Sequence, residues 1–292
     1  MTAQEAAPHR TENDENFPVA SRLVAPRHRP VILAFYRFVR KADDFADSGK
    51  LTAQEKLDAL NAMGATLEGA DDRDPEGVRL RETLEKHRLS RVHARDLLNA
   101  FRLDATKLRY RDWDDLIDYC KLSAMPVGRF VLDVHHESRA LWPASDAICA
   151  SLQVINHLQD CAEDYANLDR VYIPEDFLRR AGADVTTLKA PSASPALRNV
   201  IVELAGKCGA LLDEGAGLAA RVADWRLACE IGAIVRLARA NVDRLRKRDP
   251  LSERVHPAKA VFVLSGLVGA AEGAIARALR SGDRKPAEAR GK

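Results

Sequence analysis

The chain has 292 residues, of which 46% are hydrophobic and 5% aromatic, so it can bury a substantial core and is not intrinsically disordered. Its 45 basic and 43 acidic side chains leave a net charge of +2, which gives no electrostatic support for binding nucleic acid. The five cysteines are scattered and form no CxxC pair, which argues against a disulfide framework or a zinc site built on them and fits a reducing cytoplasm.

The elements predicted along the chain are helices, and the fold class is therefore all-α. Residues 1–15 are polar, lack the apolar core of a signal peptide and predict a flexible tail. A helix begins near Pro30 and ends near Ser48 and Gly49. Further predicted helices open at the capping box of Thr52 and Glu55 and at Asp74-Pro75, and cover 90–105, 112–124, 127–140, 145–166, 196–221, 224–247 and 257–281.

One helical domain is predicted for residues 16–282, because the long loop at 183–196 does not divide halves of different composition. Residues 283–292 predict a flexible basic tail. The apolar segment 260–276 contains Glu272 and is too short for a confident membrane span. It predicts a packed helix and leaves contact with a membrane surface open.

The first acidic motif is VRKADDFADSG, residues 39–49, at the end of the first predicted helix. Helical positions three and four apart share a face, so Tyr36, Arg40, Asp43 and Asp47 form one stripe. Asp44 lies beside this stripe.

The second acidic motif is QVINHLQDCAEDYANLD, residues 153–169. Gln153, Asn156, Asp160 and Asp164 form a stripe of the same kind, with Glu163 at its edge. His157 adjoins Asn156 and is predicted to point off the stripe.

Paired carboxylates of this kind suit Mg²⁺, which takes one or two protein carboxylates and completes its shell with water and phosphate oxygens. The hypothesis is a cavity between two Asp-rich helices that holds a diphosphate through magnesium ions, with Arg40 as a fixed positive charge. Either motif alone is equally well explained as a solvated helix end, whereas the two together favour a site.

The sequence resembles the squalene and phytoene synthases, the head-to-head prenyl synthases. The resemblance lies in RKADDFAD and the later QxxNxLQDxxED, and extends to ENFPVASRLVAPRHRP (15–30), DYCKLSAMPVGRFVL (118–132), RVYIPEDFL (170–178) and RDPLSERVHPAKAVFVL (248–264). Within the family it is most similar to the hopanoid-pathway branch that makes hydroxysqualene from presqualene diphosphate. It implies a single-domain isoprenoid synthase helical fold with a central cavity.

The resemblance implies metal binding and catalysis by Asp43, Asp47, Asp160 and Asp164, with Asn156 as a further metal ligand. It implies substrate contacts from Tyr36, Arg40, Gln153, Asn156, Tyr119 and Gly128. Two departures are Gln159, where the family often has Arg, and the residues Asp14, Glu15 and Asn16, where basic residues are common. Both fit a single, larger diphosphate substrate.

The expected function is a Mg²⁺-dependent carbon–oxygen lyase that ionises presqualene diphosphate and lets water capture the rearranged cation, without a nicotinamide cofactor. Tyr110, Tyr119 and Asp104 are candidates to position that water. The expected location is the cytoplasm, with peripheral contact at the inner face of the membrane and with neighbouring pathway enzymes left open.

Two alternatives remain at this point: a prenyltransferase that condenses two prenyl diphosphates, as presqualene diphosphate and phytoene synthases do, and a non-catalytic assembly factor. Outside the motifs, His135, His136 and Glu137 predict surface or packing roles, because neighbouring histidines point to different faces of a helix.

Overall fold

The computed structural model describes residues 24–255 and 259–282, with side chains described in the second range only for 266–279. The expected tails at 1–15 and 283–292 lie outside these residues, and the domain boundaries stay a prediction. All the regular secondary structure of the described residues is helical, and the one β-bridge among them, between Arg109 and Val171, belongs to no strand. The all-α prediction is therefore confirmed.

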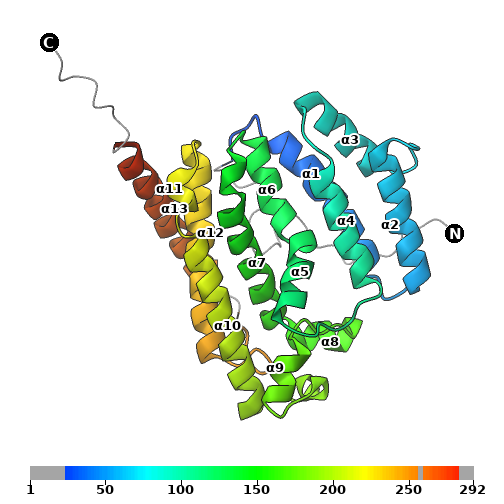
Figure 1. The fold of residues 1–292 in the computed structure, drawn as a ribbon, viewed down its shortest axis with the longest axis vertical. Coiled ribbons are helices and arrows are strands. Elements are labelled where there is room, and N and C mark those ends of the chain that lie inside the picture. The colour runs from blue at the N-terminus through cyan, green and yellow to red at the C-terminus, as the bar shows by residue number, and fades with distance from the viewer. Residues whose placement is uncertain (1–23, 256–258, 283–292) are drawn as a thin grey trace.

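The helices are, in order, α1 (Arg29–Ala46), α2 (Ala53–Glu68), α3 (Pro75–His87), α4 (Val92–Asp104), α5 (Trp113–Ser123), α6 (Met125–Val134), η1 (Arg139–Leu141), α7 (Trp142–Gln159), α8 (Cys161–Leu168), α9 (Glu175–Arg180), η2 (Val185–Lys189), α10 (Pro195–Gly215), α11 (Leu218–Arg221), α12 (Trp225–Lys247) and α13 (Lys259–Gly282). Figure 1 shows α1 to α4 on one side, α10, α12 and α13 on the other, and α5 to α7 between them.

Two apolar clusters hold these groups together. The smaller one joins α1 to α4 and includes Phe35, whose ring stacks on Phe130 of α6 at a centroid distance of 3.9 Å. The larger one joins α5 and α7 to α12. Because α6 and α7 lie between the groups, the central helices can present polar side chains towards α1.

Several predicted boundaries are wrong in ways that matter for function. The predicted helix 127–140 is α6, which ends at Val134, since His136 takes the left-handed φ of 56° and terminates the helix. The predicted helix 145–166 is two helices that meet at Asp160, with φ −104° and ψ 9°. The predicted break between the helices 112–124 and 127–140 is present at Ala124, and Pro126 lies in the first turn of α6.

The C-terminal half also differs in detail. The predicted helix 196–221 is α10 followed by the short α11, and the predicted loop 183–196 contains η2. Helix α9 was not predicted. In the part of the chain that the structure describes, no helix is both long and apolar enough to span a bilayer.

Candidate active site

Helix α1 carries the first acidic motif at its C-terminal end. Pro30 starts the helix, and buried Ile32, Phe35 and Phe38 fix its inner face. The Arg40 guanidinium donates to Asp43 Oδ2 at 2.8 Å and to Asp44 Oδ1 at 2.5 Å. Asp47 caps the helix, and its backbone N–H donates to the Asp43 carbonyl. The predicted stripe is therefore formed, although Arg40 also holds the neighbouring Asp44.

Helices α7 and α8 carry the second acidic motif around their junction. The N–H of Asp160 donates to the Asn156 carbonyl and that of Asp164 to the Asp160 carbonyl, so backbone hydrogen bonds continue through the break. The Gln153 amide nitrogen lies 2.9 Å from His157 Nε2, and His157 Nδ1 lies 3.6 Å from Asp164 Oδ2. His157 therefore faces the acidic motif, and the prediction that it points away was wrong.

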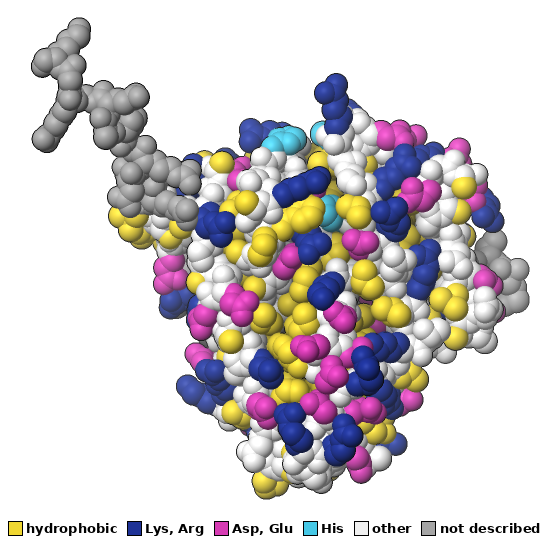
Figure 2. Space-filling view, in the orientation of Figure 1, with side chains coloured by type: hydrophobic (Ala, Val, Ile, Leu, Met, Phe, Trp, Pro, Cys, Tyr) yellow, Lys and Arg dark blue, Asp and Glu magenta, His cyan; other side chains and the backbone are white. Residues whose placement is uncertain are grey.

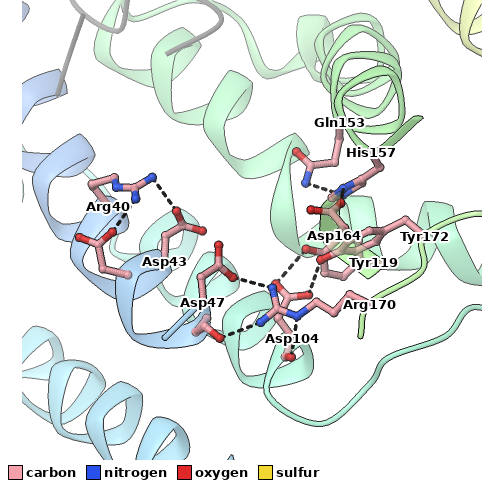
Figure 3. A network of polar contacts seen from close by, with 12 residues as sticks. Arg40, Asp43, Asp47, Asp104, Tyr119, Gln153, His157, Asp164, Arg170 and Tyr172 are labelled. Atoms are coloured by element: carbon pink, nitrogen blue, oxygen red, sulfur yellow. Dashed lines mark hydrogen bonds and ion pairs between the residues drawn. The ribbon is translucent and has the colours of Figure 1, made fainter. Parts of the chain in front are cut away.

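Arg170 links the two motifs. It follows α8 in the chain, and its side chain is only 6% exposed. Its guanidinium donates to Asp47 Oδ1 at 2.6 Å, to the Ala46 carbonyl at 2.7 Å and to the Asp104 carbonyl at 3.1 Å. The residue next to the second motif thus holds the end of the first, as Figure 3 shows.

A buried carboxylate and two tyrosines complete the network. Asp104, at the end of α4, accepts hydrogen bonds from the hydroxyls of Tyr119 at 2.9 Å and Tyr172 at 3.1 Å. The Tyr172 ring stacks on His157 at a centroid distance of 3.4 Å. A continuous path of contacts therefore runs from Asp164 through His157, Tyr172, Asp104 and Arg170 to Asp47, and Figure 3 places Asp43, Asp47 and Asp164 around one region.

Negative charge dominates this region. Although the Asp43 side chain keeps 32% of its surface exposed, loss of hydration and the neighbouring Asp47 raise the pKa of Asp43 to about 8, against the opposing effect of Arg40. Burial also raises the pKa of Asp104, although Arg170 and Tyr119 oppose this. Burial and the Asp104 charge raise the pKa of Tyr119, so this hydroxyl remains a neutral donor.

The residues fit divalent magnesium. The donors are carboxylates and amide oxygens, which are hard ligands. Burial first and the neighbouring Asp47 carboxylate second raise the pKa of Asp43, and a bound cation would oppose both effects by stabilising the charged form. Asp43, Asp47, Asn156, Asp160 and Asp164 are the residues that would hold it.

The predicted site residues fall into three groups. Those in one network, directly or through Arg170 and His157, are Arg40, Asp43, Asp47, Tyr119, Gln153 and Asp164. Tyr36, Asn156 and Asp160 are half-buried on α1, on α7 and at its end, where the periodicity expected them. At Gly128 the space that a Cβ would occupy is filled by Ser145 and Cys149 of α7, so the structure gives this glycine a packing role. Its contact with substrate stays a prediction.

Two residues were missed as members of the site, Arg170 and Tyr172. Both belong to the RVYIPEDFL segment that carries the resemblance, and this was the signal that could have found them. Tyr110 stacks on Tyr172, but its buried hydroxyl has no partner in the described ranges. Gln159 is buried with both amide atoms equally unpartnered there.

Known proteins are similar to this chain over most of its length. A sequence model of the family described as squalene/phytoene synthase matches residues 10–260. A hydroxysqualene synthase of Rhodopseudomonas palustris is 51% identical over 264 residues, which is 90% of each chain. A hydroxysqualene synthase of Sinorhizobium fredii is 50% identical over 271 residues, 93% of each chain.

A solved structure is similar as well. The crystal structure of a squalene synthase from Alicyclobacillus acidocaldarius superposes with a TM-score of 0.70 at 32% identity. The match covers 78% of this chain and 87% of that one.

Proposed function

The chain belongs to the squalene/phytoene synthase family and is an enzyme of the isoprenoid synthase fold, and we propose that it is a hydroxysqualene synthase. In this proposal the substrate is presqualene diphosphate, and the products are hydroxysqualene and diphosphate, which makes the enzyme a carbon–oxygen lyase. The observation that carries the proposal is the sequence identity to two relatives named hydroxysqualene synthase. It is 51% and 50%, and the matches cover 90% and 93% of each chain. The contact path between the two acidic motifs supports it.

Magnesium, when bound, would neutralise the leaving diphosphate as a Lewis acid. The chain's own contribution begins with the two acidic motifs, which supply carboxylates from opposite sides of one region. Arg40 and Arg170 fix Asp43 and Asp47 in place before substrate arrives, so little reorganisation is needed on binding. No nicotinamide cofactor is part of the proposal.

The reaction breaks the bond between carbon and the diphosphate oxygen, and the electron pair leaves with diphosphate. The resulting cyclopropylcarbinyl cation rearranges by ring opening to an allylic cation. Tyr36, half-buried on the face of α1 that carries the first acidic motif, supplies an aromatic ring that can stabilise positive charge through its π face. Apolar helix faces shield the cation from early attack by water.

The last step forms a carbon–oxygen bond between water and the allylic cation, and the proton that the water loses passes to the released diphosphate. Tyr119 and Tyr172 both donate to Asp104, so their hydroxyl oxygens keep lone pairs that can accept from a water molecule. We assign this positioning role to Tyr119, with Asp104 as the group that orients it. His157 lies between Tyr172 and Asp164 and so connects the two tyrosines to the second acidic motif.

Purified enzyme incubated with presqualene diphosphate and Mg²⁺, without any reductant, tests the proposal. Mass spectrometry of the lipid extract should show hydroxysqualene, with one oxygen from labelled water. Formation of a C30 or C40 product from two prenyl diphosphates, and none from presqualene diphosphate, would instead establish a prenyltransferase.

Lack of turnover on every substrate, in a chain that binds Mg²⁺ and diphosphate, would favour an assembly factor.

We propose a cytoplasmic enzyme that releases its water-insoluble product at the inner face of the membrane. Sedimentation of the active chain with anionic vesicles tests that location.

A further inference from the structure

A second cluster of metal-ligand side chains lies at the opposite end of α1 from the acidic motif. His28 caps the start of α1, His135 caps the end of α6, and Asp224 caps the start of α12. One ligand atom from each lies within 4.8 Å of the other two. Since α1 has 18 residues, about 27 Å of helix separates this cluster from Asp47. The cluster is therefore separate from the site that would bind diphosphate.

His135 presents an unused lone pair to this cluster. Its Nδ1 lies 2.8 Å from the Val131 carbonyl, which can only accept, so Nδ1 carries a proton and, in the neutral ring, Nε2 keeps its lone pair. The His135 side chain is 1% exposed, and Nε2 is buried without a hydrogen-bond partner in the part of the chain described. Nε2 lies 4.0 Å from Asp224 Oδ2. A buried acceptor of this kind is costly unless something fills the gap.

The other two residues also present acceptors. His28 is buried and accepts from Arg27 Nε through Nε2 at 2.9 Å. Asp224 accepts from the N–H of Arg226 through Oδ1 at 2.8 Å, which leaves Oδ2 towards His135. Arg27 Nη2 lies 4.0 Å from that oxygen, but the Arg27 side chain is 75% exposed and can move away.

The surrounding contacts hold the three residues in place. Glu137, next to the cluster, is engaged by the N–H groups of Ala223 and Asp224 at 2.7 and 3.0 Å, which fixes the start of α12 against the end of α6. The bond from His135 Nδ1 to a carbonyl is the outer contact that metal-binding histidines usually make. His135 and Asp224 are thus each held by a hydrogen bond on the atom that would not bind the ion, whereas His28 Nε2 accepts from Arg27 and would bind an ion once that exposed side chain moves aside.

We propose that His28, His135 and Asp224 form a zinc-binding site that ties α1, α6 and α12 together. Two imidazoles and one carboxylate suit Zn²⁺ and other late divalent metals, and do not suit Mg²⁺. Three protein ligands leave the fourth position of a tetrahedral ion to water. Two ligands of a tetrahedral ion with bonds of about 2.1 Å lie about 3.4 Å apart, so the 4.0 Å between His135 Nε2 and Asp224 Oδ2 would have to shorten by about 0.6 Å.

The His135 ring is buried and packs against the ring of His28, which agrees with the expected packing role, and the proposed site would add a metal ligand to that role. The role of the proposed site is structural. It would connect helices that belong to the two separate apolar clusters, α1 in one and α12 in the other. Zinc should therefore raise the thermal midpoint of the whole chain.

The test uses full-length protein that carries Asp43→Asn and Asp164→Asn, which weakens zinc binding at the acidic motifs, with excess Mg²⁺ present to compete for the carboxylates that remain. After dialysis against Zn²⁺, elemental analysis should give one equivalent per chain, and Co²⁺ in its place should show visible absorption of a four-coordinate ion. His135→Ala and Asp224→Asn should each lower the affinity at least about tenfold and remove the zinc-dependent rise in thermal midpoint. His87→Ala, a change at an exposed histidine on α3, should alter neither.

Two further readouts keep the result decisive. Asp224→Asn retains the oxygen that caps α12, so it carries the test if His135→Ala does not fold. Arg27→Gln should strengthen zinc binding severalfold, because it removes a competing positive charge. Absence of binding in the parent chain, or one equivalent retained unchanged in both ligand variants, would overturn the proposal.

Discussion

Arg170→Met should destabilise the protein more than any surface charge change, because Arg170 satisfies two buried carbonyls at once. The side chain is 6% exposed, and its three contacts reach Ala46, Asp47 and Asp104. Methionine fills a similar volume without any donor. The substitution therefore isolates the polar contribution.

The expected loss follows from the groups left behind. Each carbonyl left unpaired, at Ala46 and Asp104, costs about 1 kcal/mol or more. Asp104 also loses the cation that opposes the rise of its pKa, which adds about 1 kcal/mol before the carboxyl group takes up a proton. Asp47 is 43% exposed and contributes little. The sum is about 3 kcal/mol in the free energy of unfolding.

Urea denaturation monitored by circular dichroism measures this loss. The urea concentration at the midpoint should fall, while the dependence of the free energy of unfolding on urea concentration should not change. Arg170→Lys should recover part of it, since one amine keeps the charge but cannot reach all three acceptors. The matched control is Arg248→Gln, whose ion pair with Glu253 joins side chains that are 53% and 50% exposed, where the change should stay below about 0.5 kcal/mol. A loss of less than about 1 kcal/mol for Arg170→Met would refute the reasoning.

Three further predictions concern packing, pH and metal. Gly128→Ala would place a Cβ 2.3 Å from Ser145 Oγ and should cost about 2 kcal/mol in thermal or urea unfolding, whereas Gly49→Ala, with nothing within 4 Å, should not destabilise. Partial burial opposes ionisation of Asp249, but hydrogen bonds from backbone N–H groups outweigh it and lower the pKa of this carboxyl group, so its contribution to stability is present at neutral pH and is lost as pH falls below about 4. Asp249→Asn should therefore lower the free energy of unfolding by about 1 kcal/mol at pH 7 and by less at pH 3. An equal loss at both pH values would contradict this. Burial and the neighbouring Asp47 carboxylate raise the pKa of Asp43 to about 8, so Mg²⁺ binding at pH 7 should release protons and become tighter as pH rises towards 8. Calorimetry in buffers of different ionisation enthalpy measures the released protons. A Mg²⁺ affinity that does not change between pH 6.5 and 8.5 would contradict the prediction.

Local patterns were enough to predict the helices that carry the site. Pro30 and the apolar spacing of α1 place Asp43 and Asp47 near a helix end, and both are there. The break at Asp160 was not predictable, because no proline or glycine marks it. The end of α6 was missed for a related reason: His136 adopts a positive φ that sequence signals associate with glycine.

The contacts between motifs were beyond sequence reasoning from the residues alone. Arg170 and Asp47 are 123 positions apart, and no periodicity relates them. Asp104 was named only as a candidate to position water, whereas its buried carboxylate joins two tyrosines of different segments. Such links depend on how α4 packs against α5, a long-range arrangement that a helical pattern does not specify.

The central claim is that both acidic motifs hold one diphosphate through shared magnesium. Calorimetric titration of Mg²⁺-saturated protein with inorganic pyrophosphate measures this for the parent chain, Asp43→Asn, Asp164→Asn and the double variant. The account predicts that one pyrophosphate binds per chain and that each single variant lowers its affinity at least about tenfold. The double variant should bind hardly more weakly than either single variant, because loss of one carboxylate already removes the shared magnesium site. Affinity losses that simply add, or binding unchanged by either substitution, would contradict it.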